Sequence, residues 1–169
     1  IPNYPEGQFY KGYSFLKPKK EYYKGILIKR TFLIPRKNAT SLMLFANYIS
    51  FAFFATIASI FRIRSEYDLI FVFETSPITV GIPAIMLKKL KKIPIFFWVL
   101  DLWPESVYAM IEVKSTLIRS LLDRLVRYIY RNCDRIFVSS RSFIDPVKGK
   151  GVNEKKLAYI PNWAEDVYH

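Results

Sequence analysis

Four short apolar runs, separated by segments of helical pattern, constrain the fold of this chain more than any other feature. The runs lie at residues 67–75, 93–101, 135–140 and 156–163. Uninterrupted apolar runs of this length are typical of parallel strands that are buried on both faces. Strands that alternate with helices favour right-handed crossover connections. The sequence therefore predicts an α/β fold, a Rossmann-like parallel sheet with helices on both faces.

The segments between the runs have helical patterns. Residues 76–92 are predicted to form a turn and a helix, with four lysines near its end that favour the helix dipole. Residues 104–112 are expected to form a short helix, and residues 141–151 a turn and helix. Together with the four runs, these segments predict one domain over residues 1–169.

A longer amphipathic helix is predicted over residues 115–134. Three arginines, at spacings of three and four, line one side of it, which makes that side a candidate surface for anionic lipid headgroups or a simple solvated face. These arginines are Arg124, Arg127 and Arg131. The opposite, apolar face is predicted to carry Leu117, Leu121, Leu122, Leu125, Val126 and Ile129.

Residues 38–61 carry no charged side chain and are long enough to span a bilayer as a helix. Their polar residues fall on several sides of a helical wheel, so no solvent-facing stripe is expected. These residues are Ser41, Asn47, Ser50, Thr56 and Ser59. This composition favours a helix that is packed in the protein or lies at a membrane interface over one that spans the membrane.

The first part of the chain has a different character. Residues 1–23 are rich in Pro, Gly, Tyr and Lys, which predicts an ordered loop without helix or strand. Residues 25–34 form a strand candidate that ends at Pro35. The chain starts at Ile1 and has no signal-peptide pattern there, so we expect a domain that is trimmed at both ends.

Composition restricts the chemistry. The formal net charge of +12 predicts an anionic partner, such as phosphate or an acidic membrane surface. Nucleic acid is disfavoured, because the aromatic residues lie in apolar runs and no binding module is recognisable. One cysteine, Cys133, and one histidine, His169, leave no ligand set for a metal and no Ser-His-Asp triad. Because the one histidine is the last residue, any general base must be Asp, Glu or Tyr. No glycine-rich nucleotide motif is present, so no nucleotide site of the usual kind is expected.

In parallel sheets of this kind, ligands bind beyond the carboxyl ends of the strands. This rule selects candidate site residues in the loops that follow the four apolar runs, with Asp101 as the catalytic candidate. The candidate binding residues are Glu74, Thr75, Ser76, Pro77, Trp103, Glu105, Ser139, Ser140, Arg141 and Asn162.

Each candidate also has a structural interpretation. Asp101 either caps a helix that begins near Pro104, or binds or deprotonates a hydroxyl group with Trp103 as a stacking wall. Ser139 and Ser140 either cap the next helix or contact a ligand. Glu74 either accepts hydrogen bonds from sugar hydroxyls or pairs with a lysine.

Several of these segments resemble a known family. The stretches "ETSPITVG", "DLWPES" and "RIFVSSRSF" followed by "KLAYIPNW" are similar to the N-terminal domain of GT-B glycosyltransferases of family 4. "IPNYPEGQFYKGY" at the start resembles a loop of the bacterial subgroup that builds capsule, O-antigen and exopolysaccharide. The resemblance covers nearly the whole chain.

The resemblance implies an acceptor-binding half, with a C-terminal domain that binds the nucleotide-sugar donor and is absent from this chain. It implies a retaining transfer without metal or cofactor, and an isolated chain without activity. Asp101 matches the family's acidic strand-end position, but Leu100 stands where many members have histidine. The implied acceptor is a lipid-linked saccharide, which places the protein in the cytoplasm, peripherally at the inner face of the cell membrane.

Two other functions remain open at this stage. A GT-B sugar-nucleotide epimerase would share the fold, although such enzymes usually rely on histidines that are lacking here before His169. A non-enzymatic module that binds anions or a membrane surface would share the basic charge.

Overall fold

The computed structural model describes residues 6–14, 20–36, 40–63, 66–110 and 113–163. The chain divides into two compact units, Ile1–Ser65 and Glu66–His169. Parts of four sequence predictions lie outside the described residues. These parts are residues 1–5 and 15–19 of the N-terminal loop, residues 38–39 of the uncharged segment 38–61, the last two residues of the helix at 104–112, and His169.

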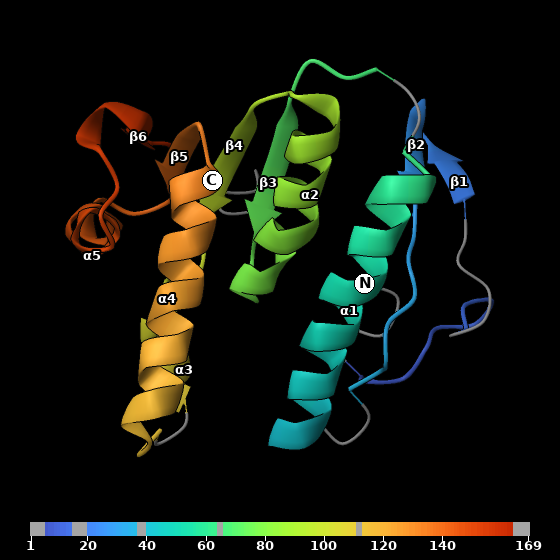
Figure 1. Ribbon diagram of the computed structural model, residues 1–169. Coiled ribbons are helices and arrows are strands. Elements are labelled where there is room, and N and C mark those ends of the chain that lie inside the picture. Colours follow the sequence, from blue (N-terminus) through green and yellow to red (C-terminus); the bar gives the residue numbers. More distant parts are fainter. Residues whose placement is uncertain (1–5, 15–19, 37–39, 64–65, 111–112, 164–169) are drawn as a thin grey trace. The chain divides into compact units, whose positions relative to one another are not determined.

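The second unit contains a four-stranded parallel sheet, which confirms the predicted Rossmann-like α/β fold flanked by helices (Figure 1). The strand order β3-β4-β5-β6 follows the chain order. Glu74, the last residue of β3, pairs with Val99 of β4, which in turn pairs with Val138 of β5. The strands are β3 Ile70–Glu74, β4 Ile95–Val99, β5 Arg135–Val138 and β6 Leu157–Tyr159.

Helices connect these strands, as predicted. Ser115 begins the long helix as its N-cap, because its hydroxyl accepts the amide N–H of Ile118 at 3.4 Å. The longer elements are α2 Gly81–Lys91, α3 Glu105–Met110, α4 Thr116–Asn132 and α5 Ile144–Gly149. Short 3₁₀ turns lie at η1 Ile78–Val80, η2 Arg141–Phe143 and η3 Glu154–Lys156.

Close packing of α2 and α4 covers one face of the sheet (Figure 1). A Cβ atom added at Gly81 would lie 2.5 Å from Ile129 Cγ2 and 3.2 Å from the Phe97 ring. Both of these side chains are fully buried. The absence of a side chain at Gly81 therefore lets the start of α2 approach α4 and β4.

The predicted apolar face of α4 is only partly correct. Leu117 and Leu121 are 68% and 53% exposed, because the first half of the helix is not covered within the described residues. Burial is confined to the second half, where Val126, Ile129 and Tyr130 face the interior. The three arginines of the predicted stripe are exposed, as expected.

The opposite face of the sheet is aromatic. Phe71 and Phe73 of β3 alternate with the buried residues of that strand and are about half exposed. The Phe73 and Trp98 rings meet edge to face, with their centroids 5.3 Å apart. Trp163 lies over Trp98 at 5.8 Å and is itself 67% exposed. This face therefore joins three of the four strands and the segment after β6 through ring contacts.

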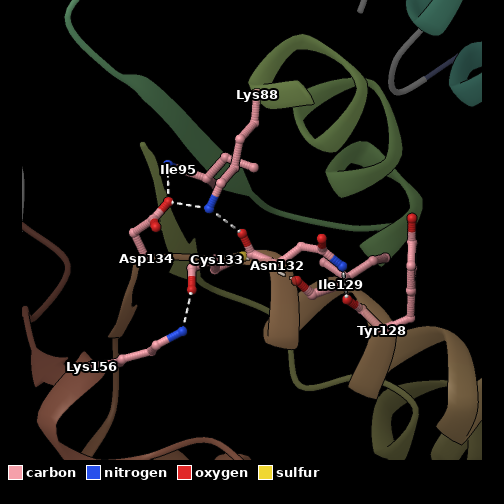
Figure 2. Close-up of polar contacts among 8 residues, drawn as sticks. All are labelled: Lys88, Ile95, Tyr128, Ile129, Asn132, Cys133, Asp134 and Lys156. Atoms are coloured by element: carbon pink, nitrogen blue, oxygen red, sulfur yellow. Dashed lines mark hydrogen bonds and ion pairs between the residues drawn. The ribbon is translucent and has the colours of Figure 1, made fainter. Parts of the chain in front are cut away.

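Charged side chains form hydrogen bonds that connect the segment between α4 and β5 with α2, β4 and η3 (Figure 2). The Asp134 carboxylate accepts from Lys88 Nζ at 2.6 Å and from the amide of the first residue of β4 at 2.7 Å. Lys88 Nζ also donates to the Asn132 carbonyl at 2.9 Å, and Lys156 Nζ donates to the Cys133 carbonyl at 3.0 Å. One of the lysines expected to favour the dipole of α2 thus also satisfies a carbonyl at the end of α4.

The first unit contains an antiparallel hairpin of β1 Lys20–Tyr23 and β2 Ile26–Lys29. The prediction of a loop up to residue 23 is therefore wrong for β1, and the strand predicted over residues 25–34 is shorter than expected. Lys24 and Gly25 have φ values of 47° and 81°, which suits the two-residue turns that connect hairpin strands. This turn brings the polar residues of β1 into pairing with β2.

Helix α1, Ser41–Phe61, has three of its polar side chains buried, those of Asn47, Ser50 and Ser59, and many of its apolar side chains exposed. Ser50 Oγ accepts the Ile34 amide at 2.9 Å, and Asn47 Nδ2 donates to the Ile34 carbonyl. Packing inside the protein is thus confirmed for the polar side only. An exposed apolar stripe runs along the helix through Leu42, Phe45, Ile49, Phe53, Ile57 and Ile60. By length and composition, α1 is the one helix among the described residues that could cross a membrane.

Candidate functional site

The loops that follow β3 and β4 meet at the carboxyl edge of the sheet, as the sequence predicts. The Leu100 amide donates to the Glu74 carbonyl at 3.0 Å, which continues the pairing of the two strands. The Asp101 amide donates to Glu74 Oε2 at 3.4 Å. Two acidic candidates from different strands are therefore neighbours, with the side chain of one against the backbone of the other.

Glu74 is completely buried. Its Oε1 atom has no hydrogen-bond partner, and it forms no ion pair with a lysine in the part of the chain that the structure describes. Burial, and then the negative charge of Asp101, raises the pKa of Glu74 to about 9. Glu74 is therefore an uncharged carboxylic acid at neutral pH, and the suggested pairing with a lysine is wrong for the described residues.

Trp103 links the two loops. Its Nε1 atom donates to Asp101 Oδ2 at 3.0 Å and to Ser76 Oγ at 3.2 Å. The ring is only 7% exposed, so it belongs mainly to the interior. Ser76 reaches this position with a φ of 122°, in a region that non-glycine residues rarely adopt. Such conformations often mark ligand-binding loops.

Asp101 is not the N-cap of the helix that follows. Helix α3 begins at Glu105, four positions later, and the Asp101 carboxylate accepts the Trp103 indole N–H instead. The structure therefore does not support the capping hypothesis for Asp101. The hydrogen bond from Trp103 fixes the direction of the carboxylate and leaves its other oxygen, Oδ1, with no protein donor among the described residues.

Tyr130 of α4 is a polar group of this edge that sequence reasoning missed. Its hydroxyl is buried without a hydrogen-bond partner among the described residues. Burial, followed by the charges of Glu74 and Glu105, raises the pKa of Tyr130 well above its usual range. The only signal in the sequence is a tyrosine within the apolar side of an amphipathic helix, which is also typical of an ordinary core residue.

A chain of ion pairs lies beside the site and includes Glu105 and Arg127, two of the candidates from the sequence. Lys150 Nζ contacts Glu105 Oε1 at 2.9 Å and Asp123 Oδ1 at 2.8 Å, with its side chain only 12% exposed. Asp123 also pairs with Arg127 at 2.6 Å. Burial lowers the pKa of Lys150, but its hydrogen bonds to Asp123 and Glu105 outweigh this and raise it overall. Hydrogen bonds from Lys150 and Arg127 lower the pKa of Asp123.

The candidates that follow β5 and β6 have other contact partners than Glu74 and Asp101. Ser140 Oγ accepts the Ser142 amide at 3.3 Å and caps η2, as the capping hypothesis predicts. The Arg141 guanidinium lies 4.6 Å from the centre of the Tyr159 ring. Within the described segments, neither Glu74 nor Asp101 forms a hydrogen bond with these residues. Of the remaining candidates, Pro77 is buried, Ser139 is half-buried, and Thr75 and Asn162 are exposed.

Two kinds of chemistry find no support among the described residues. The described residues contain no group of three or more His, Cys, Asp or Glu side chains that could hold a metal ion. The Cys133 thiol is buried, and this burial raises its pKa to about 12, so it is a poor nucleophile. Asp101 is therefore the candidate for proton transfer at this edge. The uncharged side chains of Glu74 and Tyr130 are buried close to it.

The family model described as Glycosyltransferase Family 4 matches residues 17–166, which include every residue of the candidate site. A search of curated proteins gives no match.

Proposed function

Because the chain belongs to glycosyltransferase family 4, we propose that it is the half of the enzyme that binds the acceptor for transfer of a sugar from a nucleotide sugar. A glycosyltransferase-type function follows from the family match over residues 17–166. The choice of the acceptor side rests on the resemblance of the chain to the N-terminal half of such enzymes, and the carboxyl edge of the sheet is where ligands of such folds bind.

The observation that carries this proposal is the Asp101 carboxylate. It lies at the sheet edge, is oriented by the Trp103 indole N–H, and has Oδ1 free of protein donors among the described residues. A carboxylate in this state can accept a hydrogen bond from an acceptor hydroxyl and orient its oxygen for attack. Leu100 beside it offers no second proton acceptor.

In the proposed reaction, the bond between the anomeric carbon and the nucleotide phosphate breaks. The acceptor oxygen then bonds to the anomeric carbon on the same face, so that configuration is retained. The hydroxyl proton leaves toward Asp101 or the departing phosphate. A second domain would bind the donor, so we expect the 169-residue chain alone to be inactive. No metal or cofactor is part of the proposal.

We further propose that the acceptor is a lipid-linked saccharide in the synthesis of a bacterial surface polysaccharide, and that the protein is peripheral at the cytoplasmic face of the cell membrane. The exposed apolar stripe of α1 and the net charge of +12 support this location. Exposed Arg124 and Arg131 add positive charge on α4, whereas Arg127 is paired with Asp123.

The decisive experiment uses the complete gene product that contains this chain. Nucleotide release is followed for a panel of sugar nucleotides, with and without lipid extract, in the wild type and in Asp101→Asn. We expect release that depends on lipid and falls by about 100-fold or more in the variant. Asp145→Asn, a change of an exposed aspartate on α5, is the matched control and should leave release unchanged.

Two results would contradict the proposal in different ways. Full activity of Asp101→Asn would remove Asp101 from the site while leaving the transferase function. Absence of release with every donor, although the protein is folded, would favour a non-enzymatic module that binds anions or a membrane surface.

A further inference from the structure

We propose that Glu74 is a positioning residue whose uncharged carboxylic acid holds the backbone of Asp101, so that loss of its proton displaces the Asp101 loop. The effect on catalysis rests on the proposed function, but the proton on Glu74 and its link to Asp101 do not. The sequence offers two other roles for Glu74, contact with the acceptor or a pair with a lysine.

The first argument is the double connection between Glu74 and the loop. The Glu74 main-chain carbonyl accepts the Leu100 amide at 3.0 Å, and its Oε2 accepts the Asp101 amide at 3.4 Å. One residue of β3 therefore holds two consecutive amides where the chain leaves β4. Trp103, two positions later, then orients the Asp101 carboxylate, so a movement of the Asp101 backbone changes the direction of that carboxylate.

The second argument is the environment of the Glu74 carboxyl group. Its side chain is fully buried, and Oε1 has no partner among the described residues. The groups that face it from neighbouring elements are Asp101 of the β4 loop and Tyr130 of α4.

Among the described residues, no cation compensates for a charge at this position. The ammonium group of Lys150 is shared by Glu105 and Asp123, and no basic side chain pairs with Glu74. An ionised Glu74 would be a buried, unpaired charge next to the negative charge of Asp101. The pKa of Glu74, which burial raises to about 9, agrees with this geometry.

The consequence is a coupling between one proton and the geometry of the site. Protonated Glu74 accepts the Asp101 amide at Oε2 without repelling the Asp101 carboxylate. When Glu74 loses the proton, two negative charges face each other and the loop after β4 is pushed away. We therefore expect the Asp101 loop to change in the alkaline range, with the loss of one proton and a midpoint near the pKa of about 9.

The test is a pH titration of the full chain labelled with ¹³C-glutamate and ¹³C-aspartate and followed by NMR. We expect the Glu74 Cδ resonance and the Asp101 carbonyl resonance to titrate together with a midpoint near pH 9. In Glu74→Gln, the alkaline change at Asp101 should disappear. Glu105→Gln, which removes a carboxylate that pairs with Lys150, is the matched control and should keep the change at Asp101.

Two results of this titration would overturn the proposal. A Glu74 midpoint in the ordinary carboxyl range would overturn it, and this needs only the wild type. An Asp101 signal that does not follow Glu74, or that still titrates in Glu74→Gln, would overturn the positioning role.

A pH profile of nucleotide release by the complete gene product separates this inference from the proposed function. We expect the alkaline limb of the wild-type profile to move upward by about one pH unit or more in Glu74→Gln. An unmoved limb would contradict the positioning role. Joint titration of Glu74 and Asp101 in a protein that releases no nucleotide would uphold the link between the two residues and reject the transferase proposal alone.

Discussion

The indole N–H of Trp103 donates to the Asp101 carboxylate at 3.0 Å, and this contact orients the acid that we propose to meet the acceptor. The same N–H also contacts Ser76 Oγ at 3.2 Å, so one buried side chain joins the loops that follow β3 and β4. The direction of Asp101 therefore depends on a residue that need not touch the substrate.

Replacing Trp103 with Phe should test this role. The variant keeps an aromatic ring in the interior but leaves Asp101 Oδ2 and Ser76 Oγ without their shared donor. We expect kcat/KM for transfer to fall roughly tenfold and the free energy of unfolding to fall by about 1–3 kcal/mol. Steady-state kinetics and urea denaturation measure the two effects. Trp163→Phe, at an exposed tryptophan, is the control, and equal losses in both variants would contradict the prediction.

The stability of the protein should depend on pH through Glu74. Its pKa is about 9 in the folded chain and near 4.5 in the unfolded chain, so the folded state binds the extra proton between these values. Stability therefore falls as the pH rises through this range, by at most about 1.4 kcal/mol per pH unit. In Glu74→Gln this slope should vanish, and urea denaturation at several pH values measures it. Parallel pH dependence in both proteins would rule the explanation out.

Lys150 should contribute more to stability than Arg127, although both pair with Asp123. Lys150→Met leaves Glu105 and Asp123 without a largely buried shared cation, and we expect a loss of about 2 kcal/mol in the free energy of unfolding. Arg127→Gln breaks one exposed pair within α4 and should cost about 0.5 kcal/mol or less. Thermal denaturation of both variants checks the order, and a larger loss for Arg127→Gln would reverse it.

The arginine stripe of α4 should strengthen binding to anionic membranes. Changing Arg124, Arg127 and Arg131 together to Gln should weaken binding to phosphatidylglycerol vesicles roughly 100-fold at low salt, at about 1 kcal/mol for each arginine. The control removes the same charge elsewhere, by changing the exposed Lys89, Lys92 and Lys155 to Gln. Equal weakening by both triple variants would mean that only net charge matters, and unchanged binding would leave the stripe a solvated face.

The apolar stripe of α1 should take part in the same association. Phe45 and Phe53 are exposed, so replacing both with Ser should leave the free energy of unfolding within about 1 kcal/mol of the wild type. Vesicle co-sedimentation should nevertheless drop, because apolar area is lost from the side of α1 that we propose to meet the membrane. High-salt extraction of membranes should release the wild type without detergent. A protein that stays in the membrane fraction would instead favour a spanning helix.

The parallel sheet could be predicted because each strand is a short apolar run that ends in polar residues. The hairpin of the first unit could not, since β1 has the polar sequence Lys-Glu-Tyr-Tyr and its pairing depends on β2. The turn at Lys24 and Gly25 was its only local signal.

The candidate site was predicted in its location but not in its chemistry. Strand ends placed Glu74 and Asp101 at one edge, because parallel pairing fixes which ends meet. The uncharged state of Glu74 results from its burial and from the negative charge of Asp101, and no lysine pairs with it among the described residues. These are properties of packing. The contact between Trp103 and Asp101 likewise depends on how one loop turns. For α1, composition showed the mixture of polar and apolar residues, whereas the backbone of Ile34 decided which side became buried.

The carboxylate of Asp134 also has a consequence for the order of folding. It joins the amide of Ile95, 39 positions earlier in the chain, and the side chain of Lys88, 46 positions earlier. Parallel strands have no tight turn to bring them together, so the closure of such long loops limits the rate at which they pair. Asp134 can make these contacts only after α2 and α4 have both reached β4. We therefore expect the contacts of Asp134 to form late in folding, at the edge of the sheet opposite to the proposed acceptor site.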